Sequence, residues 1–561
     1  MARTGSQVLL DALRAEGAEY LFGIPGTLTL PVYDALIGQP GITPIVTRHE
    51  QGAGFAADGY AKVSGRTGVV FTVPGPGGTN LATALQSARE DAVPLVAVTS
   101  ALADKMRDRS AIHDVDMERA LEHVVKKVFV PASAAGIAPA LEVAFRWAGA
   151  GRPGPVQVVL KSNLFSAQEE RVPRPPEFPQ PEPLPRPDER ALDQAAAMLR
   201  AARRPVIYAG QGVVQAGCER EAQALAARLG AAVVTSIKGR GILSERDPLC
   251  FGLYHFEGCE ELLKEADLCL ALGTGFGEFA TSYFKAPIPR NLIQVDVDPQ
   301  RLGRNYPAAL GILGDAKEAL EGILKRLEDM GEAPLGEGHV RVRAGRRLYA
   351  ERLAAFLARP QAPPFHGLFV MKTLREVFPP ETIFLSDSSA TQSWLMEQAF
   401  EIYRPRSLLL SEAYQTMGYA LGAAIGAKLG APERPVCAII GDGSFTMTCG
   451  ELATATALNL PLTFLIFNDG KYGALRHSQK HVFGGRFIGT DLNNPDFPAL
   501  AQAFGATGHK VTSAEGLRAA LAASLQEGGV HLVDCPIAPD VLSTRWERAA
   551  QTFRATGKPG G

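Results

Sequence analysis

Apolar runs rich in β-branched residues alternate along this chain with stretches in which apolar positions recur every three or four residues. The pattern is clearest at residues 435–473. There an apolar run, 436–440, ends at the tripeptide GDG (441–443), a segment rich in Ala and Leu follows, and a second apolar run, 462–467, ends at NDG (468–470). This pattern predicts strand, turn, helix, strand and turn, which together form one βαβ unit of a parallel sheet.

The same alternation continues through the rest of the chain, with two interruptions. Residues 171–188 are rich in proline and can form neither a helix nor a central strand, so they should be an extended connector. Residues 332–339 are polar and contain glycine. We therefore predict three α/β domains, at residues 1–170, 189–330 and 365–540, each built on a doubly wound parallel sheet.

Three predicted turns in the first region follow the carboxyl ends of strands, where open α/β sheets bind their ligands. They contain Gly26 and Thr27, then Glu50, and then Gly75 and Asn80. Glu50 precedes a helix of small residues, so its side chain should be partly buried. A position beside a helix N-cap explains Glu50 as well as a catalytic role does. The third turn, PGPGGTN, lacks the last glycine and the downstream acid of a dinucleotide fingerprint.

Composition narrows the class of protein without identifying it. The chain has 561 residues, 46% of them hydrophobic and 21% charged, with a net charge of −2, so charge gives no reason to expect binding to nucleic acid or to an anionic membrane. No apolar run is long enough to span a bilayer, and the N-terminal stretch is typical of an amphipathic helix rather than a signal peptide. The seven cysteines form no CxxC pair, which favours reduced thiols and a cytoplasmic location.

The turns at 441–443 and 468–470 offer oxygen ligands beside glycines, a combination that suits Mg²⁺ holding a diphosphate. GDG followed after 24 residues by Asn-Asp resembles the diphosphate motif of thiamine-diphosphate (ThDP) enzymes. The resemblance implies that Asp442, Asp469 and the backbone carbonyl of Lys471 bind the metal. It also places Asp469 where the family usually has Asn, which adds negative charge beside the diphosphate. An ordinary βαβ unit with a tight turn is the plainer alternative.

The segment RHEQGAGFAADGYAKVSGRTGV (48–69) resembles the part of these enzymes that carries the catalytic glutamate. The resemblance implies that Glu50 shares a proton with the aminopyrimidine ring of ThDP and so activates the thiazolium carbon. It further implies that Met417 supports the bent cofactor and that the carbonyl of Gln415 accepts its amino group. The remaining cofactor contacts implied in this way are Gly26, Thr27, Gly75, Asn80, Gly441, Gly443, Ser444 and Tyr472.

The middle region contains a glycine-bearing stretch, 210–217, which we interpret as a turn after a strand. Residues 292–305 resemble the central domain of acetolactate-synthase-like enzymes, which binds FAD in the biosynthetic members. Those members hold FAD with two arginines in an Ala-Arg-Phe-Asp-Asp-Arg run, whereas this chain has TGFGEF at 274–279. Because both bidentate donors are missing, we predict that FAD is not bound.

The resemblance implies decarboxylation of a 2-oxo acid, and local differences bear on the next step. The acceptor pocket of biosynthetic acetolactate synthases is altered here at Ala101, at 112–114 and at Ser478. His113 lies where pyruvate decarboxylases carry a histidine pair, so it is a candidate general acid, and a loop residue is an equal alternative. His477 and His481 could also reach the site, although a polar loop explains them as well. NDGKYGALR (468–476) resembles benzoylformate decarboxylase.

We therefore predict a ThDP- and Mg²⁺-dependent 2-oxo acid carboligase similar to acetolactate synthase. The alternatives are a decarboxylase that releases an aldehyde, a catalytically silent ThDP-binding homologue and, less well supported, a protein that binds NAD or CoA. In the family, the glutamate and the metal site meet across a subunit boundary. The resemblance therefore implies a homodimer or homotetramer whose active sites combine Glu50 of one chain with Asp442 of another.

Overall fold

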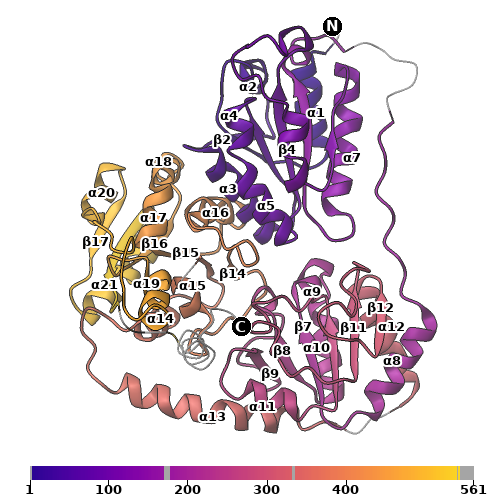
Figure 1. Ribbon diagram of the computed structural model, residues 1–561, viewed down its shortest axis with the longest axis vertical. Coiled ribbons are helices and arrows are strands. Elements are labelled where there is room, and N and C mark those ends of the chain that lie inside the picture. Colours follow the sequence, from indigo (N-terminus) through magenta and orange to yellow (C-terminus); the bar gives the residue numbers. More distant parts are fainter. Residues whose placement is uncertain are drawn as a thin grey trace.

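The computed structural model describes residues 3–169, 177–331, 335–388, 390–539, 541 and 543. The chain folds into three parts, each built around one six-stranded sheet whose strands pair in parallel. Figure 1 shows the N-terminal part (indigo to purple) above the central part (magenta to pink) and the C-terminal part (orange to yellow). The predicted α/β class, with doubly wound parallel sheets, is confirmed. The inner strands are buried on both faces, which explains why they are continuous apolar runs, whereas the edge strands at 43–46, 310–313 and 507–510 are partly exposed.

The N-terminal sheet has the strand order β2-β1-β3-β4-β6-β5. Its strands are β1 (Tyr20–Gly23), β2 (Thr43–Val46), β3 (Gly68–Thr72), β4 (Leu95–Ala101), β5 (Val128–Phe129) and β6 (Pro155–Lys161). Its helices are α1 (Gly5–Ala15), α2 (Leu30–Leu36), α3 (Glu50–Ser64), α4 (Pro76–Thr79), α5 (Ala82–Glu90), α6 (Met117–Ala120) and α7 (Ile137–Gly149). The order reverses between β1 and β3, so the turns after these two strands face one crevice.

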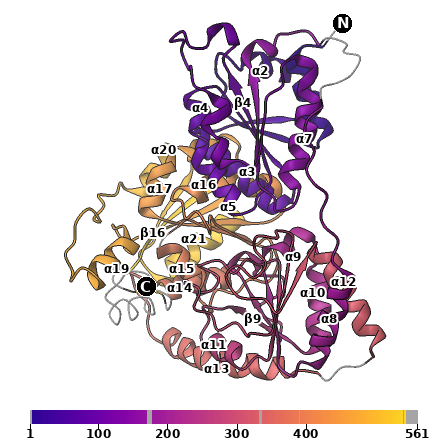
Figure 2. The ribbon, with the colours of Figure 1, turned by 45° about the vertical axis from the view of Figure 1, so that its right-hand side comes forward.

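The central sheet has the order β12-β11-β10-β7-β8-β9. Its strands are β7 (Pro205–Ala209), β8 (Ala232–Thr235), β9 (Cys250–Leu253), β10 (Leu268–Leu272), β11 (Leu292–Asp296) and β12 (Leu310–Leu313). Its helices are α8 (Glu189–Ala201), α9 (Gln211–Ala216), α10 (Glu219–Leu229), α11 (Cys259–Lys264) and α12 (Ala316–Asp329). The described residues 177–188 contain no helix or strand and run between the N-terminal and central parts (Figure 2).

The C-terminal sheet has the order β14-β13-β15-β16-β18-β17, the same plan as the N-terminal sheet. Its strands are β13 (Ile383–Ser386), β14 (Leu408–Leu409), β15 (Val436–Gly441), β16 (Leu462–Asn468), β17 (Thr507–Lys510) and β18 (Val530–Pro536). Its helices are α14 (Gly367–Val377), α15 (Ala390–Leu395), α16 (Tyr419–Gly430), α17 (Asp442–Thr448), α18 (Leu452–Ala457), α19 (Gly473–His481), α20 (Phe497–Ala503) and α21 (Ala514–Gln526).

The structure corrects two of the turn predictions and adds a long helix. The stretch 210–217 is not a turn, because Gly210 is extended, α9 follows it, and Gly217 closes the helix in the left-handed region with φ of 63°. The glycines therefore mark the two ends of a helix. PGPGGTN likewise contains one helical turn, α4, after Gly75 with φ of 66°. The added helix, α13 (Gly338–Leu357), leads from the central part to the C-terminal part.

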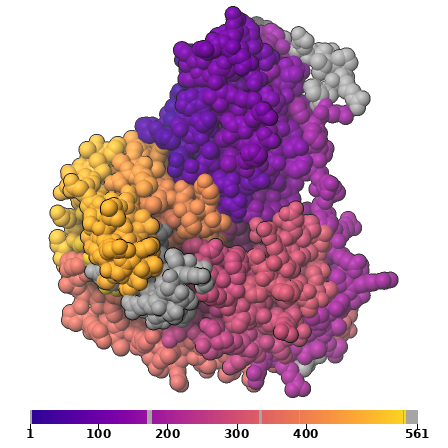
Figure 3. All heavy atoms as spheres, viewed as in Figure 1, coloured from indigo at the N-terminus to yellow at the C-terminus, as the bar shows by residue number. Residues whose placement is uncertain are grey.

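The N-terminal and C-terminal parts meet through α3 and α16, which lie side by side in both views (Figures 1 and 2). Small residues allow this close approach. A Cβ added to Gly426 would lie 1.7 Å from the carbonyl oxygen of Ala56, and one added to Gly59 would lie 2.1 Å from that of Ala423. The two helices therefore fix the relation between the two sheets. Figure 3 shows the N-terminal part resting on the other two.

All seven cysteines carry free thiols, as predicted, and only Cys449 is not fully buried. Within the part of the chain that the structure describes, we find no helix that is both long enough and apolar enough to cross a bilayer.

Candidate active site

Two carboxylates stand together at the carboxyl edge of the C-terminal sheet. β15 and β16 are paired neighbours, with Gly441 opposite Phe467, so the residues that follow them emerge at the same edge. Asp442 is the first residue of α17, and Asp469 directly follows β16. One Asp442 oxygen accepts a hydrogen bond from the backbone N–H of Gly443 at 2.8 Å, and the other accepts one from that of Gly470 at 2.8 Å. The side chain of Asp442 therefore ties the two turns together.

One cavity collects most of the residues that the sequence singled out in this part of the chain. The predicted residues that line it are Met417, Gly441, Asp442, Gly443, Ser444, Asp469, Lys471 and Tyr472. Gln415 is connected to its wall, because the Gln415 Oε1 accepts a hydrogen bond at 3.0 Å from the hydroxyl of Ser388, another lining residue. Gly443 must lack a side chain here, since a Cβ would lie 2.5 Å from the ring of Tyr472.

The two carboxylates carry unbalanced negative charge. Burial raises the pKa of Asp442. Burial and the neighbouring charge of Asp442 raise the pKa of Asp469 to about 7. The ammonium of Lys471 offsets this charge only in part, because it pairs with Asp491 at 3.0 Å, and only its backbone N–H donates to Asp469, also at 3.0 Å. A cation between the two carboxylates would lower their electrostatic energy.

Asp469 makes the stability of the metal-free protein depend on pH. Its folded-state pKa lies above its unfolded value of 3.8, so between about pH 4 and 7 the folded chain binds more protons than the unfolded one. We therefore expect the melting temperature of the metal-free wild type to fall as pH rises through this window. Asp469→Asn should remove this component of the fall. Melting curves of both proteins in chelator at pH 5, 6, 7 and 8 would contradict the expectation if their pH slopes were identical.

Sequence reasoning missed two residues of this site. Asn494 donates from one amide nitrogen to Asp442 at 2.7 Å and to the side chain of Asn468 at 3.0 Å. No local pattern could have identified it, since Asn in a polar loop usually indicates only a turn. Trp394 also lines the cavity.

The interpretation of His477 and His481 as loop residues is wrong, because both lie on α19, and His477 is buried and lines the cavity.

A second group of predicted residues lies at the carboxyl edge of the N-terminal sheet. Glu50 is the first residue of α3 and is only 9% exposed. Its Oε2 accepts a hydrogen bond from the side-chain amide of Asn80 at 2.9 Å, and the glycine-rich turn passes close to its other oxygen, because a Cβ on Gly77 would lie 3.2 Å from Oε1. The structure therefore brings the predicted carboxylate and the predicted amide into direct contact.

His113 and Gly26 extend this group. His113 has φ of 67° and lies against Gly75, where an added Cβ would come within 3.1 Å of the His113 Cα. The Nδ1 atom of His113 is buried and has no hydrogen-bond partner among the described residues. Gly26 lies against the end of β3, where a Cβ would be 2.4 Å from the side chain of Val73, and the adjacent Thr27 is exposed.

In the part of the chain that the structure describes, this second group lies outside the cavity of Asp442. None of Gly26, Thr27, Glu50, Gly75, Asn80 and His113 lines the cavity of Asp442. They are linked by structure instead: Glu451, beyond α17, accepts hydrogen bonds from the backbone N–H groups of Arg48 and His49, each at 3.0 Å. The start of α3 is thus anchored to the C-terminal part, nine positions along the chain from Asp442.

Comparison with known proteins identifies the family. The N-terminal TPP binding, central, and C-terminal TPP binding domain models of thiamine pyrophosphate enzymes match residues 3–120, 192–323 and 387–535. The large subunit of acetolactate synthase from Corynebacterium glutamicum is 35% identical over 530 residues, which cover 91% of this chain and 83% of that protein. The chain belongs to the thiamine pyrophosphate enzyme family. Thiamine pyrophosphate is ThDP, so the predicted resemblance to acetolactate-synthase-like ThDP enzymes is confirmed.

Two further relatives of this ThDP enzyme differ in the reaction that their names state. The acetolactate synthase of Mycobacterium bovis is 32% identical over 552 residues, covering 96% of this chain and 88% of that protein. A probable 2-ketoarginine decarboxylase from Pseudomonas aeruginosa is 35% identical over 551 residues, covering 95% of this chain and 93% of that protein. The similarity thus extends over almost the whole chain in both cases.

The residues around Asp442 fit a diphosphate held by a divalent cation. The cavity offers two carboxylates whose pKa values burial raises, so that a nearby cation would favour their charged forms, and Gly441 and Gly443 leave room beside them. Among the described residues, no three His, Cys, Asp or Glu side chains gather around a possible metal position. A metal ion here would therefore complete its oxygen shell with backbone and diphosphate oxygens, as Mg²⁺ commonly does.

Proposed function

We propose that this ThDP enzyme decarboxylates a 2-oxo acid and joins the remaining carbon fragment to a second carbonyl compound, as its acetolactate synthase relatives are named for doing. The observation that carries the proposal is the shared cavity of Asp442, Asp469 and Met417, in a chain similar to acetolactate synthases over more than 90% of its length. When bound, ThDP would supply a nucleophilic carbon and a positively charged thiazolium ring that can take up the electron pair left behind when carbon dioxide departs.

Residues of both groups would bind and orient the cofactor. Asp442, Asp469 and the carbonyl of Lys471 hold Mg²⁺, and the glycines of the two turns let the backbone approach the diphosphate. Met417 and the carbonyl of Gln415 orient the aminopyrimidine ring. The Glu50 carboxyl group would exchange a proton with the aminopyrimidine ring, and Asn80, which donates to Oε2, keeps that group in one orientation.

We also propose that the working enzyme is a homodimer or a pair of such dimers. The support is that Glu50 does not line the cavity of Asp442 within the described part of one chain, although the proposed chemistry needs the two residues at opposite ends of one cofactor. A second copy would supply the missing group to each site. Mixing Glu50→Gln chains with Asp442→Ala chains tests this idea, since restored turnover requires one intact site per mixed dimer. No recovery after subunit exchange would contradict it.

The main alternative is a decarboxylase that releases an aldehyde. It is favoured by the similarity to the probable 2-ketoarginine decarboxylase and by His113, whose buried Nδ1 has no partner among the described residues. Ser478 replaces the acceptor-pocket tryptophan, and its hydroxyl donates back to the carbonyl of Ala474 at 3.2 Å. Analysis of the products from pyruvate, benzoylformate and 2-ketoarginine separates the two: acetolactate supports carboligation, and a free aldehyde supports decarboxylation. No turnover on any 2-oxo acid would favour a silent homologue.

We further propose that the enzyme works without FAD. The two arginine positions of that run fall at Gly275 and Phe279, so neither residue offers a guanidinium. Phe276, at the position of the run's own phenylalanine, is 1% exposed and packs edge-on against Tyr208 and Tyr306. We expect purified protein to show no absorption band near 450 nm and no gain in melting temperature with added FAD. A stoichiometric flavin band would contradict this prediction.

A further inference from the structure

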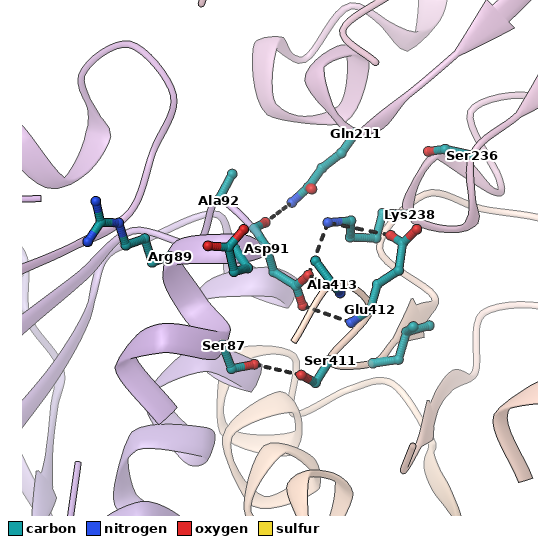
Figure 4. Close-up of polar contacts among 12 residues, drawn as sticks. Ser87, Arg89, Asp91, Ala92, Gln211, Ser236, Lys238, Ser411, Glu412 and Ala413 are labelled. Carbon is teal, nitrogen blue, oxygen red and sulfur yellow. Dashed lines mark hydrogen bonds and ion pairs between the residues drawn. The ribbon is translucent and has the colours of Figure 1, made fainter. Parts of the chain in front are cut away.

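Asp91 is a fully buried carboxylate at the point where the three parts of the chain meet (Figure 4). It directly follows α5 in the N-terminal part. One of its oxygens accepts a hydrogen bond from the ammonium of Lys62, on α3, at 3.1 Å. The other accepts one from the ammonium of Lys238, in the central part, also at 3.1 Å. Asp91 thus joins the N-terminal part to the central part.

The same carboxylate also holds the C-terminal part. It accepts hydrogen bonds from two consecutive backbone N–H groups, those of Glu412 and Ala413, each at 3.2 Å. Burial opposes ionisation of Asp91, but the positive charges of Lys238 and Lys62 outweigh it and lower the pKa of Asp91 to about 2. Asp91 is therefore an anion that binds four donors from three parts of the chain, and charge-assisted hydrogen bonds of this kind are strong.

The backbone that Asp91 holds belongs to a segment without regular structure. Residues 410–418 connect β14 to α16 and contain both Gln415 and Met417. Gln415 has φ of 54°, in the left-handed region, and its side-chain amide donates back to the carbonyl of Glu412. At the far end, the backbone N–H groups of Tyr419 and Ala420 donate to Asp387 at 3.0 and 3.2 Å. Since no helix or strand orients this segment, buried carboxylates at its two ends do so.

The central part reinforces this arrangement although it contributes none of the proposed cofactor contacts. From α9, the side chain of Gln211 donates to the backbone carbonyl of Asp91 at 2.8 Å, and that of Gln215 donates to the carbonyl of Ala92 at 2.7 Å. Lys238 also pairs with the Glu412 carboxylate at 3.5 Å. Figure 4 shows Gln211 above Asp91 and its neighbour Ala92, and Lys238 beside the Asp91 carboxylate.

We propose that Asp91 is a positioning residue for the cofactor, which acts by fixing Glu412 and Ala413 and, through them, the segment that presents Gln415 and Met417. The inference rests on the proposed function, because it assigns that segment to the ThDP site. It gives the central part a role in cofactor binding: through Lys238 it holds the carboxylate that in turn holds the segment.

The test is Asp91→Asn. The amide keeps the shape and one acceptor oxygen, but it loses the charge, and its NH₂ group faces two donors, either Lys238 and the N–H of Ala413 or Lys62 and the N–H of Glu412. We expect the Kd for ThDP to rise about 10- to 100-fold, the usual effect of removing a residue that holds a ligand-binding residue in place. Calorimetry with the full-length protein at saturating Mg²⁺ measures this Kd. The kcat at saturating ThDP should change by a smaller factor.

Glu245→Gln is the matched control. Glu245 is also a buried carboxylate between two parts of the chain, accepting hydrogen bonds from Arg240 at 2.6 Å and from the backbone N–H of Ile402 at 2.9 Å. The substitution makes the same change from a carboxylate to an amide, but none of these hydrogen bonds involves residues 410–418. We expect Glu245→Gln to lower the melting temperature of the cofactor-free protein. Its Kd for ThDP should stay within about twofold of the wild-type value, well below the 10- to 100-fold rise expected for Asp91→Asn.

An Asp91→Asn protein that melts earlier but binds ThDP as tightly as the wild type overturns the inference. If that variant does not fold, Lys238→Met decides, because it keeps the aliphatic stem and the two backbone contacts of Asp91. Its Kd should rise about tenfold, at the low end of the same range, and an unchanged Kd overturns the inference. If the wild type itself binds no ThDP, the proposed function fails, and the inference fails with it.

Discussion

Glu50→Gln should abolish nearly all turnover while leaving ThDP binding almost intact. Glutamine keeps the length of the side chain and an oxygen that can accept the hydrogen bond from Asn80, so α3 should start as it does in the wild type. It cannot hold an exchangeable carboxyl proton. Because proton transfer by a positioned side chain contributes about 10²- to 10⁴-fold to rate, we expect kcat for carbon dioxide release to fall by that factor.

Two measurements make this prediction specific. The Kd for ThDP should stay within about threefold of the wild-type value, since the binding energy comes from the Mg²⁺-diphosphate contacts at the other site. Glu142→Gln is the control, because Glu142 lies on α7 of the same part of the chain and pairs with Arg146 at the surface. That variant should turn over normally. Turnover above a tenth of wild type in Glu50→Gln would show that another group moves the proton.

Asp442→Ala should eliminate cofactor binding itself. The substitution removes a proposed metal ligand and also leaves the N–H groups of Gly443 and Gly470 without their acceptor. Loss of an outer-shell partner costs about 10- to 100-fold in metal affinity, so loss of a ligand should cost at least about 100-fold. Titration with Mg²⁺ at fixed ThDP, followed by calorimetry, measures the loss, and turnover should disappear in parallel.

Two further variants should lower the affinity for Mg²⁺ less than Asp442→Ala does. Asn494→Ala removes only the amide that donates to Asp442 at 2.7 Å, so it should raise the Kd for Mg²⁺ about tenfold, at the low end of the outer-shell range. Asp491→Asn removes a carboxylate of the same region that is 68% exposed and pairs with Lys471 and Arg476, and it should have almost no effect. Equal losses in all three variants would indicate general damage to the turn rather than a metal site.

Local pattern was sufficient for the fold class and for much of the site. Strands β15 and β16, for example, begin where their apolar runs predict and extend one residue beyond them, because a strand buried on both faces must be apolar almost throughout. Asp442 and Asp469 could be paired from sequence alone, since consecutive strands of a βαβ unit are neighbours and their ends share one edge. Helix α9 was mistaken for a turn because glycine occurs both in turns and at helix ends, and only the surrounding packing distinguishes them.

The sequence by itself thus determined the α/β class, the family and the two carboxylate groups, because each depends on short-range periodicity or fixed spacing. Only the tertiary structure decided that Asn494 reaches Asp442, that Asp91 binds donors from all three parts, and that Glu50 does not line the Asp442 cavity within the described part of one chain. Asp91 and Ala413 are 322 positions apart, and no local signal encodes such a contact. It exists because three sheets pack together and leave a buried carboxylate that must find its donors there.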